Sequence, residues 1–267
     1  MSILFNLSGT TSQLQSEIFP PLNVSDGNYE IGLIYFMGNN TVYNIHEKNN
    51  SFRVLFAYNY RLYGADCSLS PGMYDFELIT REFIAEIKEA FKIFQKDLKL
   101  TADEKTKYDN LVQHIEFTSD QLTHKWVLEI PEDDTRAIYV DMKVKNSIAP
   151  LLGLQLSTLP DLINSTKKQF THILVNHISL NTVRVLNIHC NLTGNSYING
   201  VPSHLLYSIP LSKAPGYQIV EAPKDVVFLP VTDTLIDTVE IRITDQYNTL
   251  LDFKGDPIVI VLELRKK

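Results

Sequence analysis

The sequence predicts a mainly all-β protein, an antiparallel jelly-roll sandwich with a helical insertion at about residues 77–110. In the closing stretch, 238–267, apolar and polar side chains alternate with the period of two that turns one face of a strand toward a core. Turn residues and prolines separate about twelve to fourteen short strand-like runs, at the intervals typical of sandwiches and barrels. A helical period occurs in only one long segment. These observations favour one large β domain, 1–267, that carries a helical insertion.

The first predicted strand lies at about 29–37, where β-forming residues follow a turn. Pro20 and Pro21 precede it and cannot donate to a strand ladder, so this part of the chain is expected at an edge or corner. Further strands are expected near 42–45, 52–57 and 61–63.

From residue 77 to residue 98 the period changes to that of an amphipathic helix, with Asp75 as its expected N-cap. Apolar side chains recur every three or four positions, at Ile79, Phe83, Ile87, Phe91 and Phe94. Such a stripe is more often the core face of the helix than a ridge for a partner protein. Thr101 is typical of a second N-cap, so a shorter polar helix is expected to run to about Asn110.

Strand patterns return after the helices. A hairpin is expected over 112–131 and a short capped helical turn over 146–154. Other strands are predicted at 137–144, 172–176, 182–192, 205–209, 218–222, 226–231 and twice within 238–267. Eight of these strands would form the jelly roll, and the remaining hairpins would be insertions.

Composition excludes several classes of protein. The chain has 267 residues, 44% of them hydrophobic, and a formal charge of −7, which argues against direct nucleic-acid binding. Neither a signal peptide nor a membrane span is expected from the sequence. Cys67 and Cys190 are too few for a disulfide framework, so free thiols in a reducing compartment are expected.

No pattern indicates chemistry, so no enzyme activity, no cofactor and no metal site are expected. His172 and His177 are five positions apart and have no neighbouring carboxylate at ligand spacing. His189 is adjacent to Cys190, and neighbours on a strand point to opposite faces, which works against a nucleophile pair. Ser203 next to His204 has the same defect. Acidic residues in predicted turns, Asp133, Asp134 and Asp245, are explained by turn formation.

Two rival functions remain open at this point. A carbohydrate- or protein-binding β-sandwich of lectin type would need an exposed aromatic platform, for which Tyr58, Asn59 and Tyr60 are the best candidates. A cupin-type enzyme would need an inward cluster of His and Glu, and the sequence does not offer one.

Three blocks of the sequence resemble one family. Segments 188–209 and 215–267 are similar to the end of the penton-like minor capsid proteins of Polinton (Maverick) elements and adintoviruses. Segment 19–54, with its Pro-Pro pair and its Tyr-Glu-x-Gly-Leu strand, resembles the opening of that family, and 146–154 resembles a third block. The blocks occur in the family's order and cover a little over half of the chain.

This resemblance implies a single jelly-roll capsid subunit that forms homopentamers at the vertices of an icosahedral shell. The implied partner is a larger, double jelly-roll major capsid protein, and no catalytic residue carries over. The implied location is the virion capsid, with synthesis in the cytoplasm and assembly in the host nucleus. Residues 80–110 depart from the family pattern, and the chain has no Arg-Gly-Asp triplet to support a receptor-loop role.

The last predicted strand adds a candidate subunit interface. Its opening residues are apolar on both faces, although on an isolated sandwich Val259 and Val261 would face outward. Exposed apolar runs usually mark a partner surface. We therefore expect Val259 and Val261 to lie at or near the interface between subunits.

Overall fold

The structure is a computed structural model that describes residues 2–59, 61–119, 126–131, 138–159, 169–173 and 179–267. Its contacts divide the chain into two compact units. The first unit combines Met1–Val42 with Val183–Lys267, and the second is Tyr43–Thr182. The second unit is therefore an insertion into the sequence of the first.

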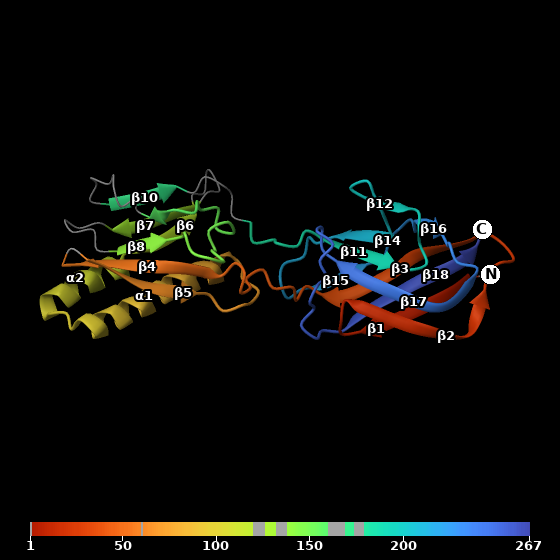
Figure 1. Ribbon diagram of the computed structural model, residues 1–267, viewed down its shortest axis with the longest axis horizontal. Helices are drawn as coiled ribbons and strands as arrows, with labels where there is room; N and C mark the ends of the chain where they lie inside the picture. The colour runs from red at the N-terminus through yellow and green to blue at the C-terminus, as the bar shows by residue number, and fades with distance from the viewer. Residues whose placement is uncertain (1, 60, 120–125, 132–137, 160–168, 174–178) are drawn as a thin grey trace. The chain divides into compact units, whose positions relative to one another are not determined.

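The first unit is a sandwich of two antiparallel sheets (Figure 1). The first sheet has the order β1-β18-β3-β15, with β16 also paired to β3. The second sheet has the order β14-β11-β17-β2. Their bounds are β1 Ser2–Gly9, β2 Gln13–Asn23, β3 Tyr29–Asn39, β11 Val185–Cys190, β14 Leu205–Pro210, β15 Gln218–Glu221, β16 Phe228–Pro230, β17 Leu235–Thr244 and β18 Ile258–Lys266.

The order of these strands is that of a jelly roll. The chain passes from β1 in the first sheet to β2 in the second and back to β3, and later from β17 back to β18 between β1 and β3. The red strands of the chain start consequently lie beside the blue strands of its end (Figure 1). The predicted fold class, an antiparallel jelly roll with a helical insertion, is confirmed.

The core of the first unit lies between the two sheets and is built by alternation. In β18 the side chains of Ile258, Ile260, Leu262 and Leu264 are fully buried, and the residues between them are not. The facing strand β17 supplies Val239, Ile241 and Ile243 to the same core. Between β11 and β14 a separate hairpin is formed by β12 (Ser196–Ile198) and β13 (Val201–Ser203). Its turn is Asn199–Gly200, with both residues at positive φ.

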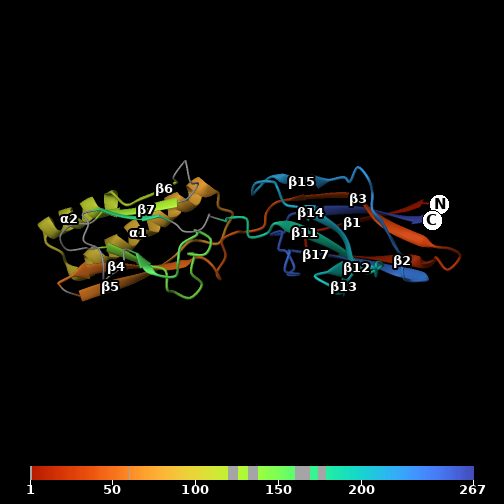
Figure 2. The same cartoon turned by 90° about the horizontal axis from the view of Figure 1, so that it is seen from above.

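The second unit packs two sheets and two helices around a core of its own. Its elements are β4 Ser51–Tyr58, β5 Arg61–Ser68, α1 Phe76–Leu98, α2 Ala102–Gln113, β6 Glu116–Ser119, β7 Trp126–Pro131, β8 Ile138–Asp141, β9 Thr158–Leu159 and β10 Gln169–Ile173. The sheets have the orders β5-β4-β8-β9 and β10-β7-β6. Figure 2 shows α1 between the β4–β5 and β6–β7 strands.

The predicted helix is confirmed, and its phenylalanine stripe is its core face. The ring of Phe83 lies 4.5 Å from that of Phe52 in β4 and 5.5 Å from that of Phe117 in β6. The Asp75 side chain accepts a hydrogen bond from Leu78 N at 2.8 Å, as an N-cap does. Thr101 begins α2 with a capping box, as predicted, although α2 continues to Gln113.

The contacts place more of the chain outside the sandwich than helical periodicity indicates. Only 77–110 is helical insertion by sequence pattern, whereas the second compact unit extends from Tyr43 to Thr182. The reason is that β4 and β6 bury their apolar faces on α1, and strands of either unit have the same period of two. Conversely, β1 and β2 belong to the sandwich although the sequence predicts no strand before residue 29.

Leu262→Ala is expected to lower the free energy of unfolding by about 2–5 kcal/mol, because it removes a fully buried side chain and leaves a cavity. The neighbouring change Val261→Ala should cost less than about half as much, because Val261 is already partly exposed. Urea denaturation followed by circular dichroism measures both. Equal losses would contradict the inward–outward alternation of β18.

Candidate assembly surface

The outward side of β18 is where the sequence places its candidate interface. Val259 and Val261 are partly exposed and alternate with the buried core residues, so both side chains point away from the sandwich core. Register with the neighbouring strands pairs Val259 with Ser8 of β1 and with Met37 of β3. The predicted outward orientation is therefore confirmed, and the neighbours of each valine are defined.

Apolar side chains from four strands share this side of the first sheet. Met37 is the partner of Val259 and also of Val220 in β15, which is 52% exposed. Val261 is the partner of Tyr35, whose hydroxyl lies 3.0 Å from the sulfur of Met37. We call this surface the apolar face; its members are Leu4, Tyr35, Met37, Val220, Val259 and Val261.

The outward side of the second sheet is different in character. Gln13 and Gln15 of β2 are exposed and stand opposite Arg242 and Glu240 of β17. His189 of β11 continues the row beyond Arg242. One outer side of the sandwich is thus polar, as a solvated sheet requires. The other carries apolar side chains beside the polar Asn6 and Ser8 of β1, and exposed apolar side chains that gather on one sheet are typical of a surface that another molecule covers.

A charged margin closes one end of the apolar face. The Arg265 guanidinium donates to Glu30 at 2.6 Å and lies 3.4 Å from the ring centroid of Phe228 in β16. Lys266 Nζ donates to the Asp26 carboxylate at 2.8 Å, and this hydrogen bond lowers the pKa of Asp26. The end of β18 is therefore tied to β3 and to the turn before it.

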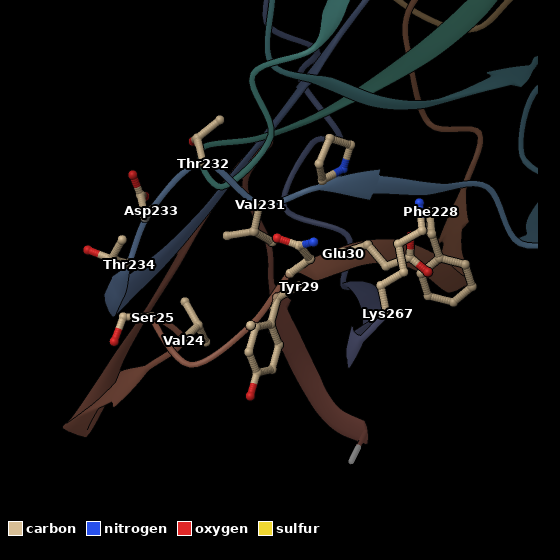
Figure 3. A pocket seen from close by; sticks show the side chains of 13 residues that line it. Val24, Ser25, Tyr29, Glu30, Phe228, Val231, Thr232, Asp233, Thr234 and Lys267 are labelled. Atoms are coloured by element: carbon tan, nitrogen blue, oxygen red, sulfur yellow. The ribbon is translucent and has the colours of Figure 1, made fainter.

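A hollow lies next to this margin, between the β2–β3 turn, β16 and the segment that follows β16 (Figure 3). Its volume is about 450 Å³. Two backbone hydrogen bonds hold its walls, from Val24 N to Thr234 O at 2.9 Å and from Lys267 N to Asn28 O at 2.8 Å. Its lining includes Val24, Tyr29, Phe228, Pro230, Val231, Asp233 and Lys267.

His189 is buried on the otherwise polar side because the β12–β13 hairpin covers it. Its Nε2 lies 2.9 Å from the Thr244 hydroxyl, and its Nδ1 lies 3.5 Å from the Ser203 hydroxyl. Burial lowers the pKa of His189, and the nearby Arg242 guanidinium lowers it further. Cys190 points into the core instead, where burial raises the pKa of its thiol to about 12.

His189 and Cys190 point to opposite faces of β11, as predicted, but the contact between His189 and Ser203 was not predicted. The Asn199–Gly200 turn folds Ser203 back onto His189, whereas the His204 Nδ1 lies against the Thr193 carbonyl. The signal for this contact is the Asn-Gly pair, which is typical of a two-residue hairpin turn. The ring nitrogens of His189 meet only hydroxyl groups, which suits a structural role.

The other candidate residues form no metal site in the part of the chain that the structure describes. Within the ranges that the structure describes, no group of three His, Cys, Asp or Glu side chains could hold a metal ion. His177, Asp133 and Asp134 lie outside those ranges, as does the side chain of His172. Asp245 forms the turn predicted for it, accepting from Tyr247 N and Thr249 N at 2.8 Å each. No helix in the described part of the chain is long and apolar enough to cross a membrane.

Of the aromatic platform in the lectin alternative, the structure describes Tyr58 and Asn59. Tyr58 ends β4 and packs edge-on against Phe94 of α1, with the ring centroids 6.4 Å apart. Asn59 follows at positive φ, and Tyr60 lies outside the described residues. Because Tyr58 is half-buried against α1, it offers little surface for stacking a sugar.

Comparison with known proteins supports the fold. No protein-family model matches the chain, and no curated protein matches it in sequence. Among the solved structures that match is the crystal structure of selenomethionine-labelled mavirus penton protein, with a TM-score of 0.54 and 11% sequence identity. The alignment covers 100% of both chains. The similarity to penton-like proteins that the sequence predicts is thus confirmed for the fold.

The pH dependence of stability should report on His189. A folded-state pKa below the ordinary value of 6.5 means that the fold favours the neutral imidazole. This contribution is present above that value and is lost as the pH falls through the lower, folded-state pKa, at up to about 1.4 kcal/mol per pH unit. His189→Gln should therefore flatten the decline in the free energy of unfolding below pH 6.5.

The measurement is urea denaturation at a series of pH values. His114→Gln is the matched control, because His114 is an exposed histidine of the second unit. If the free energy of unfolding declines with pH in the His189 variant as it does in the unaltered protein, or if the control shows the same flattening, burial of His189 does not govern stability below pH 6.5.

Proposed function

We propose that the chain is a structural capsid protein, a penton-like vertex subunit that assembles into homopentamers in an icosahedral shell. Its role is architectural rather than catalytic. Its partners are copies of itself and a double jelly-roll major capsid protein, and its location is the virion capsid, reached by assembly in the host nucleus. In this proposal 1–267 acts as one capsid subunit, with the jelly roll as its assembling part.

The observation that carries this proposal is the apolar face on a jelly roll that aligns end to end with a penton protein. Leu4 is 64% exposed and Val220 is 52% exposed, at opposite margins of the face. A neighbouring subunit would bury more of the surface of Val259 and Val261, which lie between them. Each Å² of apolar surface removed from water stabilises the contact by roughly 25 cal/mol. The polar outer side of the second sheet supplies no comparable driving force.

A ring explains why exposed apolar side chains gather on only one outer side of the sandwich. Around a five-fold axis each subunit offers two unlike surfaces, one to each neighbour, and the contact closes without free ends. The apolar face would meet a different surface of the next subunit, so the chain does not need two matching apolar sides. Val259 and Val261 are the residues proposed for this interface.

The test is the double variant Val259→Lys, Val261→Lys. Two ammonium groups on the apolar face should abolish pentamers and leave folded monomers, because burying an unpaired charge in an interface costs several kcal/mol. Light scattering coupled to size-exclusion chromatography measures the mass, and circular dichroism checks the fold. Electron microscopy of the unaltered protein should show five-fold rings.

A matched control places the same charges on the polar side. Gln13→Lys, Gln15→Lys also adds two ammonium groups at alternate positions of one strand, and both sites are exposed. This control should assemble like the unaltered protein. If the Val259 and Val261 variant also assembles normally, the apolar face is not the subunit interface.

A further inference from the structure

One segment of β2 leaves the strand ladder and exposes an aromatic side chain. Glu17 is the partner of Thr238 in β17, and the next paired residue, Leu22, is the partner of Ile236. The four residues 18–21 thus stand opposite a single residue of β17. Phe19 lies within this bulge and is 94% exposed, the highest value among the large apolar side chains described as exposed.

The bulge is well suited to hold an anchor residue. Pro20 and Pro21 fix two φ angles and have no N–H group to leave unpaired. A backbone held in one conformation before binding loses less conformational entropy on binding. Buried aromatic side chains are also common among the few residues that carry most of the energy of an interface. Phe19 is therefore a candidate for burial when subunits assemble.

The β16 wall of the hollow lies on the opposite flank of the sandwich from the Phe19 bulge, whereas Val24 and Ser25, which follow β2, line its other side. β2 is the last strand of the second sheet and lies beside β1, whereas β16 pairs with the far side of β3 in the first sheet. The lining of the hollow is largely polar, but Phe228, Pro230 and Val231 give it one apolar wall. Figure 3 shows Phe228 and Val231 on either side of Glu30. Phe228 also lies under Arg265, so this wall is continuous with the margin of the apolar face.

The Phe19 bulge and the hollow lie at the same end of the strands of the sandwich. β16 pairs with Glu30–Gly32, close to the start of β3, and the Phe19 bulge is close to the end of β2. The β2–β3 turn joins these two strand ends. A rotation about an axis along the strands leaves height unchanged, so features at one level on opposite flanks can meet between neighbours in a ring.

We propose that Phe19 of one subunit inserts into the hollow beside β16 of the next copy of the chain. The contact is heterologous, because a projection on one flank meets a hollow on the other. Its volume of about 450 Å³ leaves room for one aromatic ring among Phe228, Pro230 and Val231. The inference rests on the proposed homopentamer and assigns a specific contact to it.

Disulfide trapping tests the contact directly. In the variant Phe19→Cys, Pro230→Cys each subunit would present one thiol to each neighbour. Oxidation should then give a ladder of covalent species that ends at the pentamer on a non-reducing gel. The native thiols should not interfere, because Cys67 and Cys190 are both buried. The control Phe19→Cys, Tyr247→Cys uses an equally open site, 80% exposed, in the turn between β17 and β18, and should give no ladder.

A second measurement needs no new bond. Phe19→Ala should raise the concentration at which half of the chains are assembled by at least tenfold, as light scattering over a dilution series would show. Tyr197→Ala is the matched control, because Tyr197 is an aromatic residue of the β12–β13 hairpin that is 68% exposed. It should leave the assembly concentration unchanged.

The outcomes separate this proposal from the one on which it rests. Pentamers that form normally from Phe19→Ala, with no ladder from the Phe19→Cys, Pro230→Cys variant, would overturn the Phe19 contact and leave the pentamer standing. A single covalent dimer would also overturn it, because a two-fold contact is not a ring. An unaltered protein that stays monomeric at every concentration would overturn both proposals.

Discussion

The fold of the first unit depends on β18 being held between β1 and β3. Eight residue pairs join it to β1 without interruption, and a second ladder joins it to β3 with one register shift after Val261. This position brings the end of the chain against its beginning, so the first sheet is complete only when β18 is in place. It also fixes which side chains of β18 are inside, because a slip of one residue would exchange Leu262 for Val261.

The separation of two cores allows the insertion. Buried apolar residues form one cluster within the sandwich and a second cluster around α1, and the two clusters share no residue. The chain leaves the sandwich after β3 and returns before β11, so the insertion interrupts a connection and not a strand. A jelly roll can therefore keep its hydrogen-bond ladders while 43–182 carries a different structure.

The sequence predicted what local periodicity encodes. The α1 stripe and the outward valines of β18 follow from the spacing of residues along one element. Ile3, Phe5 and Leu7 also alternate in β1, but the run is short and β2 is broken by prolines, so neither strand was recognised. The period of β4 and β6 is the same as that of the strands of the sandwich, so no local pattern separates the two compact units. Met37 and Val220 join the apolar face only through pairing between distant strands, which no local pattern contains.

If the proposed assembly forms, differences between the surfaces of the sandwich favour a ring over a two-fold pair. A two-fold contact needs one patch that complements itself, whereas here the unlike features are separated: apolar side chains on one sheet, an exposed aromatic ring on the β1–β2 flank and a hollow at β16. Sheet edges give a similar indication. The outer edge of β2 is interrupted by its bulge and by Pro20 and Pro21, which discourages open-ended strand pairing between subunits. Subunits would then associate through side chains on unlike flanks. Such heterologous contacts form a closed ring, and not an open filament, only when the rotation that relates neighbouring subunits closes on itself.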